Sequence, residues 1–247
     1  MADIIWQSFL SAVVGGVLSL DRTAALQIMI SRPIVTAPVI GYMLGDAMTG
    51  LVIGGVLELL WIGELPIGGH IPPHEVIMTA LITAVSLIGH KALMGTGIDI
   101  FPWKFGRADI IFIIGFTILI VIPMDMICKR VDAAARSLNA RFFNAALAGL
   151  NRGFIVSTEI NNVKGLGIFF ILNFTTMFVL IIAGILLIYF LLPSLPAVVV
   201  MSLPLACGAA VILSLSSVYS AGYSSKSLPV FLATTFIIAA FLAVIIG

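Results

Sequence analysis

Charged residues are scarce in this chain. Lys, Arg, Asp and Glu make up 9% of its 247 residues, whereas a soluble domain carries about 25%. Hydrophobic residues make up 61%, and the mean hydropathy is +1.24. This composition excludes an ordinary soluble domain and predicts an all-α integral membrane protein. The spans are expected to be helices because the apolar runs last longer than the alternating strands of an outer-membrane barrel.

Several chemical signatures are also missing. The formal net charge is +1 and dense basic clusters are absent, which gives no support for a nucleic-acid partner. The two cysteines, Cys128 and Cys207, have no metal-ligand neighbours, so neither a disulfide framework nor a metal site is predicted. The sequence contains no nucleotide loop and no nucleophile–base pair that we can identify. We therefore expect a protein that is not an enzyme and needs no cofactor.

Gly, Pro and carboxylates interrupt the apolar sequence throughout residues 31–75. A spanning helix needs about 20 mostly apolar residues. The uninterrupted pieces, residues 35–44 and 51–57, are too short for this. We predict broken or re-entrant half-helices, which are tolerated within a membrane only where protein buries them or they line a wet cavity.

The remaining apolar runs predict full transmembrane helices. About six full spans and the two half-length pieces would form a single membrane domain over residues 1–247. The full spans are expected at residues 4–20, 76–89, 108–124, 167–192, 197–215 and 228–246. Residues 90–107 are predicted to be a loop. Thr79, Thr83 and Ser86 share one helical face, which favours close helix packing over a cavity lining.

Residues 125–165 differ in character because they hold six of the chain's 12 Lys and Arg residues beside an approximate apolar stripe. The pattern predicts an amphipathic segment that lies on a membrane surface or packs on a partner. The positive-inside rule places it in the cytoplasm, where it could dock a soluble protein. A solvated connector is an equally open interpretation.

Carboxylates within the interrupted stretch are the first candidates for a binding site. A carboxylate at membrane depth costs about 2.5 to 3.5 kcal/mol on insertion scales and therefore indicates function. Glu58 is predicted to bind the hydroxyl groups of a neutral polyhydroxylated ligand, and Trp61 would offer its indole face to the C–H side of a sugar. Glu64 is expected at the interface. For Asp46, capping of the next half-helix is favoured over direct binding.

His70 and His74 are four residues apart, but the prolines between them prevent a regular helix from placing both on one face. A metal pair is therefore disfavoured, and the two side chains are expected at the mouth of a cavity. Because histidine titrates near neutral pH, a pH-sensitive gate is conceivable.

The interrupted stretch resembles the IIC membrane component of the mannose/fructose/sorbose family of the bacterial sugar phosphotransferase system. The matching pieces are Arg32-Pro33, Gly41, Leu44-Gly45-Asp46, Thr49-Gly50, Ile53-Gly54-Gly55, Leu57-Glu58, Gly63, Ile67-Gly68 and Pro73. In that family the sugar site lies in the region that matches residues 57–74. The resemblance thus implies a set of substrate-binding residues: Glu58, Trp61, Gly63, Gly68, Gly69 and His74, with Asp46 as a further candidate.

The resemblance also implies a function. The chain would be a sugar-translocating permease subunit of a phosphoenolpyruvate-dependent phosphotransferase system, working with a IID membrane subunit and with soluble IIA and IIB proteins that carry the phosphate. Its substrate would be a hexose or a derivative, and the broken helices would move against a scaffold of full spans. It would form an oligomeric, multi-pass protein in the lipid of the bacterial cytoplasmic (inner) membrane.

Two positions depart from the family pattern. Pro66 stands where the family often has Asn, and His74 stands where it often has Asp. Both changes remove hydrogen-bonding groups suited to a hexose. They favour the alternative function, a membrane sensor or scaffold that holds phosphotransfer proteins without moving a solute.

Overall fold

The computed structural model describes residues 2–25, 27–61, 73–95, 109–152, 158–196, 198–205, 208 and 211–212. Every regular element in these ranges is a helix, which confirms the all-α prediction. Within the described ranges, four helical stretches are long and apolar enough to cross a membrane: Ala2–Arg22, Glu75–Gly95, Ile110–Asn151 and Ile160–Ser194. Of the six spans predicted, the one at 197–215 is described only at residues 198–205, 208 and 211–212, and the one at 228–246 lies outside the described residues.

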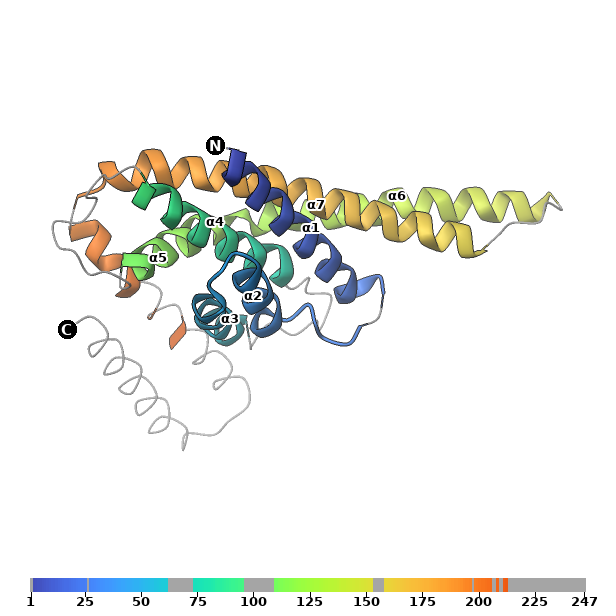
Figure 1. The fold of residues 1–247 in the computed structure, drawn as a ribbon. Helices are drawn as coiled ribbons and strands as arrows, with labels where there is room; N and C mark the ends of the chain where they lie inside the picture. The colour runs from blue at the N-terminus through green and yellow to red at the C-terminus, as the bar shows by residue number, and fades with distance from the viewer. Residues whose placement is uncertain are drawn as a thin grey trace, which may run out of the picture.

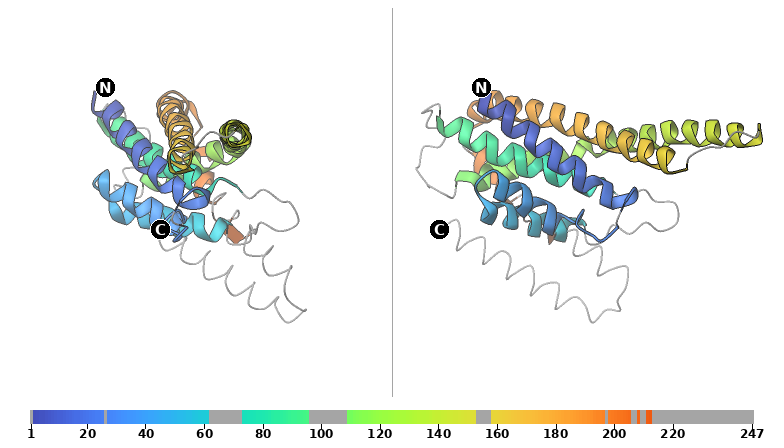
Figure 2. Two further views of the ribbon diagram at one scale, coloured as in Figure 1. Left: turned by 90° about the vertical axis from the view of Figure 1, so that its right-hand side faces the viewer. Right: turned by 45° about the vertical axis from the view of Figure 1, so that its right-hand side comes forward.

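Helix α4 (Glu75–Gly95) is the centre of the structure. It packs against α1 (Ala2–Thr23), α7 (Thr158–Leu191) and α5 (Asp109–Val121), as Figures 1 and 2 show. Its residues from Val76 to Gly89 are all buried, because they are apolar or small on every face of the helix. The predicted loop over residues 90–107 is wrong in its first part, since α4 continues through Gly95; the rest of that range lies outside the described residues.

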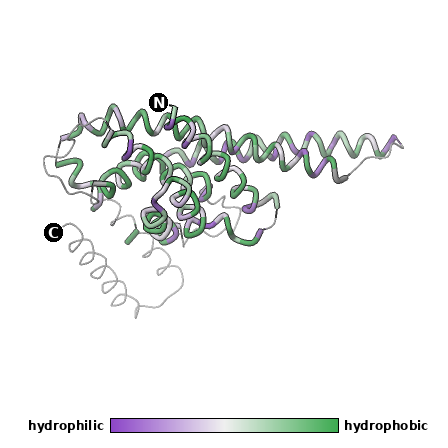
Figure 3. Tube along the Cα trace, viewed as in Figure 1, coloured by the Kyte–Doolittle hydropathy of each residue, from purple (hydrophilic) through white to green (hydrophobic). Residues whose placement is uncertain are grey.

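The outer helices carry exposed apolar side chains, among them Trp6 on α1 and Val179 and Phe190 on α7. Hydrophobic positions predominate along these helices in Figure 3. Such faces suit contact with lipid, where an exposed apolar side chain carries no penalty.

The interrupted stretch forms a hairpin of two short helices, α2 (Pro33–Met43) and α3 (Ala47–Trp61), which confirms the half-length prediction. At 1.5 Å per residue, α2 spans about 17 Å and α3 about 23 Å, less than the ~30 Å of a hydrocarbon core. Pro33 occupies the first turn of α2, where its missing N–H is not needed. Gly45 reverses the chain with a φ of +87°, a conformation that favours glycine.

Glycines let α2 and α3 approach each other closely. A Cβ atom on Gly50 would lie 2.5 Å from the carbonyl oxygen of Ala37, and one on Gly54 would lie 2.6 Å from that of Pro33. These contacts are with backbone atoms, which cannot rotate away. The Gly50–Gly54 spacing of four is the pattern by which small residues bring helices together in membranes.

The amphipathic segment predicted at 125–165 is part of a long helical hairpin. After a 3₁₀ turn, η2 (Ile122–Met124), that contains Pro123, helix α6 (Asp125–Asn151) continues the direction of α5 and projects beyond the bundle together with the first half of α7 (Figures 1 and 2). Cys128 and Ala135 form its buried side. Helix α6 thus packs against α7 of the same chain, which the sequence did not predict, while the apolar side chains of Phe142, Leu147 and Leu150 remain exposed.

We expect Gly50→Ala and Gly54→Ala each to lower the free energy of unfolding by about 1 to 3 kcal/mol, the usual cost of overpacking. Gly55→Ala is the matched control, because a Cβ atom there meets no atom within 4 Å. Thermal unfolding of the purified protein in detergent measures the difference. Equal melting temperatures for all three variants would contradict the close approach.

Candidate functional site

Arg32 links the half-helical hairpin to the central helix. Its Nη2 atom donates to Oε1 of Glu58 on α3, and its Nη1 atom lies 3.3 Å from Oε2 of Glu75, the first residue of α4. The side chains remain partly open, at 37% exposure for Arg32, 21% for Glu58 and 14% for Glu75. The triad can therefore meet a ligand without first unfolding.

Local structure explains why these groups meet. Arg32 precedes Pro33 and adopts an extended conformation (φ −68°, ψ 146°), as expected for a residue before proline. The other carboxylate oxygen of Glu58 accepts a hydrogen bond of 3.3 Å from the backbone N–H of Ile34. This N–H belongs to the first turn of α2, where donors lack intrahelical partners and a negative charge is stabilised.

A second layer of polar contacts surrounds the triad at the same end of the bundle. Asp21, at the end of α1, is buried and accepts hydrogen bonds from the backbone N–H groups of Ile28 (2.8 Å) and Ser31 (3.2 Å). These bonds hold the loop that leads to Arg32. Arg22 donates to the carbonyl oxygen of Pro73 at 3.1 Å and so ties α1 to the start of α4.

His74 lies just before α4, with its side chain buried. Its backbone N–H donates to Asp125 at 3.0 Å, and its Nδ1 atom faces the N–H of Ile77 at 3.5 Å, in the position of a helix cap. Burial is the main cause that lowers the pKa of His74 to about 3, and the positive charge of Arg22 contributes to the same shift. The imidazole is therefore neutral throughout the physiological pH range.

The structure brings some of the predicted site residues together and separates others. Trp61 lies one turn beyond Glu58, but its indole is buried in the apolar core. Asp46 precedes the opposite end of α3, about 18 Å from Glu58 at 1.5 Å per residue. It accepts hydrogen bonds from the backbone N–H (3.0 Å) and the hydroxyl (2.7 Å) of Thr49. Gly63, Glu64, Gly68, Gly69 and His70 lie outside the described residues.

The pairing of Arg32 with Glu58 and Glu75 was not predicted from the sequence. Electrostatics was the one argument that could have predicted this pairing. Buried or half-buried carboxylates need a nearby cation, and Arg32 is the basic residue that directly precedes the hairpin.

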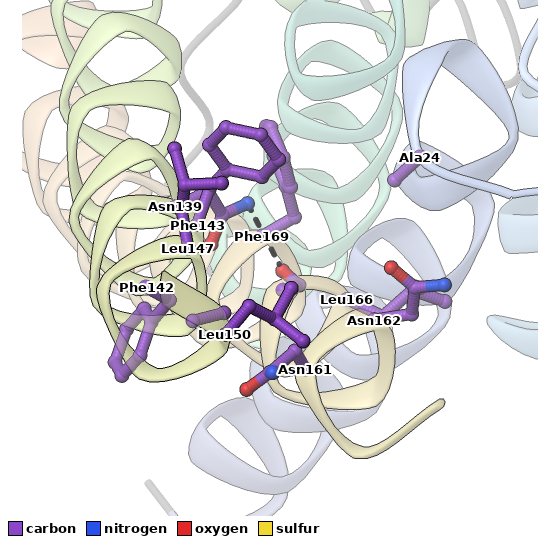
Figure 4. Close-up of a pocket in the computed structure, with 12 residues that line it drawn as sticks. Ala24, Asn139, Phe142, Phe143, Leu147, Leu150, Asn161, Asn162, Leu166 and Phe169 are labelled. Atoms are coloured by element: carbon purple, nitrogen blue, oxygen red, sulfur yellow. Dashed lines mark hydrogen bonds between the residues drawn. The ribbon is translucent and has the colours of Figure 1, made fainter. Parts of the chain in front are cut away.

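A separate groove of about 620 Å³ runs between α6 and α7 on the projecting hairpin, as Figure 4 shows. Phe142, Phe143, Leu147, Leu150, Leu166 and Phe169 supply most of its apolar lining, with asparagines among them. Asn139 donates to the carbonyl oxygen of Gly165 at 3.3 Å. The lining contains no charged residue, so its chemistry differs from that of the Arg32 triad.

The family model for the sorbose-specific IIC component of the phosphotransferase system matches residues 5–247. The chain belongs to this family. It is thus a IIC sugar permease component and a membrane protein, as the resemblance implied.

Two bacterial relatives illustrate the relationship. N-acetylgalactosamine permease IIC component 1 of Escherichia coli K12 is 33% identical over 109 residues, which cover 43% of this chain and 40% of that protein. The mannose-specific EIIC component of the same strain is 34% identical over 67 residues, which cover 27% of this chain and 25% of that protein. The aligned parts thus span less than half of either relative.

The fold of this IIC component is similar to a chain in the cryo-EM structure of the mannose transporter ManYZ in complex with microcin E492. The TM-score is 0.55 at 22% identity, covering 98% of this chain and 87% of that one. At this identity the match shows the fold alone.

The buried neutral state of His74 predicts an acid-sensitive contribution to stability. The unfolded chain takes up a proton on this histidine near pH 6.5 and the folded chain does so only near pH 3, so unfolding binds protons between these values and stability falls as the pH falls. Between pH 7 and pH 5 this single group should remove about 2 kcal/mol. Thermal unfolding at both pH values checks the effect.

His74→Asn is the comparison variant for this measurement, because asparagine can also cap α4 but does not titrate. It should lose about 2 kcal/mol less than the wild type on acidification. An identical acid-induced loss in both proteins would show that His74 is not held neutral in the fold.

Proposed function

We propose that this IIC component binds a hexose or hexose derivative at the Arg32–Glu58 pair and carries it across the bacterial cytoplasmic membrane by movement of the α2–α3 hairpin. The observation that carries the proposal is the partly exposed Glu58 carboxylate, held by Arg32 on a half-length helix. The Arg32–Glu58 pair places hydrogen-bond donors beside hydrogen-bond acceptors, as the hydroxyl groups of a neutral polyol require.

The hydrogen-bonding capacity of the pair supports this chemistry. An ionised carboxylate offers about four lone-pair sites and a guanidinium five N–H donors. Glu58 uses one site for Arg32 and one for Ile34, so further sites remain for the hydroxyl groups of a sugar. Arg32 can at the same time donate to a sugar oxygen. Charge-assisted hydrogen bonds of this kind are about twice as strong as neutral ones.

The attachments of the hairpin support a carrier movement. Arg32 fastens one end of α2 to Glu75 of α4, and Lys91 near the end of α4 donates to the carbonyl oxygen of Leu44 at the other end. Both attachments are polar side-chain contacts rather than continuous helix. A sugar oxygen that accepts a hydrogen bond from Arg32 would compete with Glu75 for the guanidinium, and so would bias the hairpin towards release from α4.

The partners follow from the family. We propose that the chain works with a IID membrane subunit and with soluble IIA and IIB proteins, which would carry the phosphate, and that it is not itself an enzyme. The names of the relatives, specific for mannose, sorbose and N-acetylgalactosamine, support hexoses, ketoses and acetylated amino sugars as the substrate class.

One observation favours the second candidate function, a scaffold for soluble phosphotransfer proteins. Three exposed arginines lie eleven residues apart: Arg130 and Arg141 on α6, and Arg152 directly after it. Eleven residues make about three full helical turns, so the three side chains lie on one face of the helix. That face lies opposite the buried Cys128 and suits an acidic protein surface. A permease that docks such proteins would also use it.

We expect the purified chain, together with a IID-type partner, to bind at least one sugar from a panel of mannose, sorbose, fructose and N-acetylgalactosamine. Glu58→Gln should weaken binding by about 1.5 to 3 kcal/mol, the range for a hydrogen bond to a charged group. Isothermal titration calorimetry measures both constants.

Asp46→Asn is the matched control. It makes the same carboxylate-to-amide change on the same helix, and asparagine also caps well, so sugar affinity should remain within about twofold of the wild type, a difference under 0.5 kcal/mol. If no sugar binds even with the partner present, the permease proposal is wrong for this chain. Binding of soluble IIA and IIB proteins that is lost on Arg130→Gln, Arg141→Gln and Arg152→Gln would then support the scaffold.

A further inference from the structure

One face of α4 carries a polar stripe along most of its length. Glu75, Thr79, Thr83, Ser86 and His90 follow one another at spacings of four, four, three and four residues. At 100° per residue the three hydroxyl residues fall within an arc of about 60°. All three are fully buried.

The hydroxyl groups of this stripe differ from the other buried hydroxyls of the protein. Among the described residues, no hydrogen-bond partner is found for the side-chain oxygens of Thr79, Thr83 and Ser86. Elsewhere in the described helices, buried hydroxyls have a carbonyl partner. Ser8, Ser11, Ser19 and Thr117 bond to the preceding turn of their own helix at 2.6 to 2.8 Å, and Thr36 bonds to the carbonyl oxygen of Ile30 at 3.3 Å.

This contrast argues against close packing as the whole reason for the stripe. A hydroxyl that serves packing in a membrane helix satisfies itself on its own backbone. A buried polar group without a partner costs about 1 to 3 kcal/mol. Three such groups in succession on the most buried helix indicate that a hydrogen-bonding ligand meets this face in another state of the protein.

The position of the stripe matches the attachment of the hairpin. Its first member, Glu75, holds Arg32 and through it Glu58. Lys91, which follows the last member, holds Leu44 at the other end of α2. Helix α2 thus runs alongside α4 between these two contacts, and on the helical wheel of α4 the hydroxyl arc lies between Glu75 and Lys91.

We propose that the face of α4 formed by Thr79, Thr83 and Ser86 is the hydroxyl-lined wall of the path along which the sugar travels with the hairpin. This inference rests on the proposed function and extends it, because it assigns transport residues outside the Glu58 site. From residue 75 to residue 90 the stripe covers about 22 Å at 1.5 Å per residue, most of the ~30 Å hydrocarbon core.

The chemistry of the wall defines the ligand class. A hydroxyl group donates one hydrogen bond and accepts others without carrying charge. It can therefore exchange hydrogen bonds with successive hydroxyls of an uncharged polyol and does not trap it, as a row of carboxylates would trap a cation. In the conformation described here the wall is fully buried, so a helix packed on α4 has to move before a ligand can reach it. Because polar side-chain contacts attach α2 to α4 at both ends, we assign this movement to α2.

The test compares a hydroxyl-free wall with a matched control. In one variant Thr79→Val, Thr83→Val and Ser86→Ala remove the three partnerless hydroxyls with little change of shape. In the control, Thr117→Val and Ser11→Ala remove two buried hydroxyls that bond to their own helices. Uptake of radiolabelled mannose, sorbose, fructose and N-acetylgalactosamine is measured in cells that express the partner proteins, and sugar binding is measured on the purified proteins.

We expect the wall variant to take up sugar at least about tenfold more slowly, which corresponds to ~1.4 kcal/mol in the barrier. Its sugar affinity at Glu58 should stay within about twofold of the wild type. Its melting temperature should be equal or higher, because removing a buried partnerless hydroxyl does not cost a hydrogen bond. The control should keep its uptake and lose some stability.

Single variants keep the inference falsifiable if the triple variant does not fold. Thr83→Ser keeps the hydroxyl and should keep uptake, whereas Thr83→Val should reduce it. Unchanged uptake in the wall variant, or equal uptake in Thr83→Ser and Thr83→Val, overturns the inference and leaves the proposed function intact. A wild-type protein that binds no sugar overturns both.

Discussion

The pairing of Arg32 with two carboxylates is the interaction on which the arrangement of this protein depends. A guanidinium and two carboxylates at one end of a membrane bundle are costly when separated, because each ion then loses water without gaining a partner. Together they fasten the α2–α3 hairpin to α4 and leave Glu58 partly exposed. The same contact therefore has two effects: it positions an element too short to span the membrane alone, and it leaves open to a ligand the carboxylate that we propose as the sugar-binding group.

The hairpin itself is held together by backbone proximity rather than by large side chains. Gly50 and Gly54 bring α3 against the carbonyl oxygens of α2, so that two helices too short to cross a bilayer behave as one compact unit. The unit is attached to α4 by polar contacts at Glu75 and Lys91. A tight unit with a few breakable attachments is the arrangement expected of a moving element, whereas α4, buried against several helices, has the character of a fixed axis.

Several sequence-based interpretations had a clear physical basis and others lacked one. The cap role favoured for Asp46 matches its hydrogen bonds to Thr49, because an Asp before a helix has few better partners than the N–H groups of the first turn. The interpretation of Thr79, Thr83 and Ser86 as packing residues agrees with their burial. It did not predict that their hydroxyl groups lack hydrogen-bond partners among the described residues. Whether a buried hydroxyl bonds to its own helix depends on a rotamer, and residue spacing carries no information about it.

The sequence by itself determined that this is a helical membrane protein, that residues 31–75 contain half-length helices and that Glu58 is a binding candidate. Each of these follows from local composition, because hydrocarbon thickness sets the required length and a carboxylate among apolar residues stands out. Only the tertiary structure decided that Glu58 meets Arg32 and Glu75, that α6 packs on α7 and that α4 lies at the centre. These contacts join residues far apart in the chain, and the choice among the available partners is made by packing rather than by local pattern.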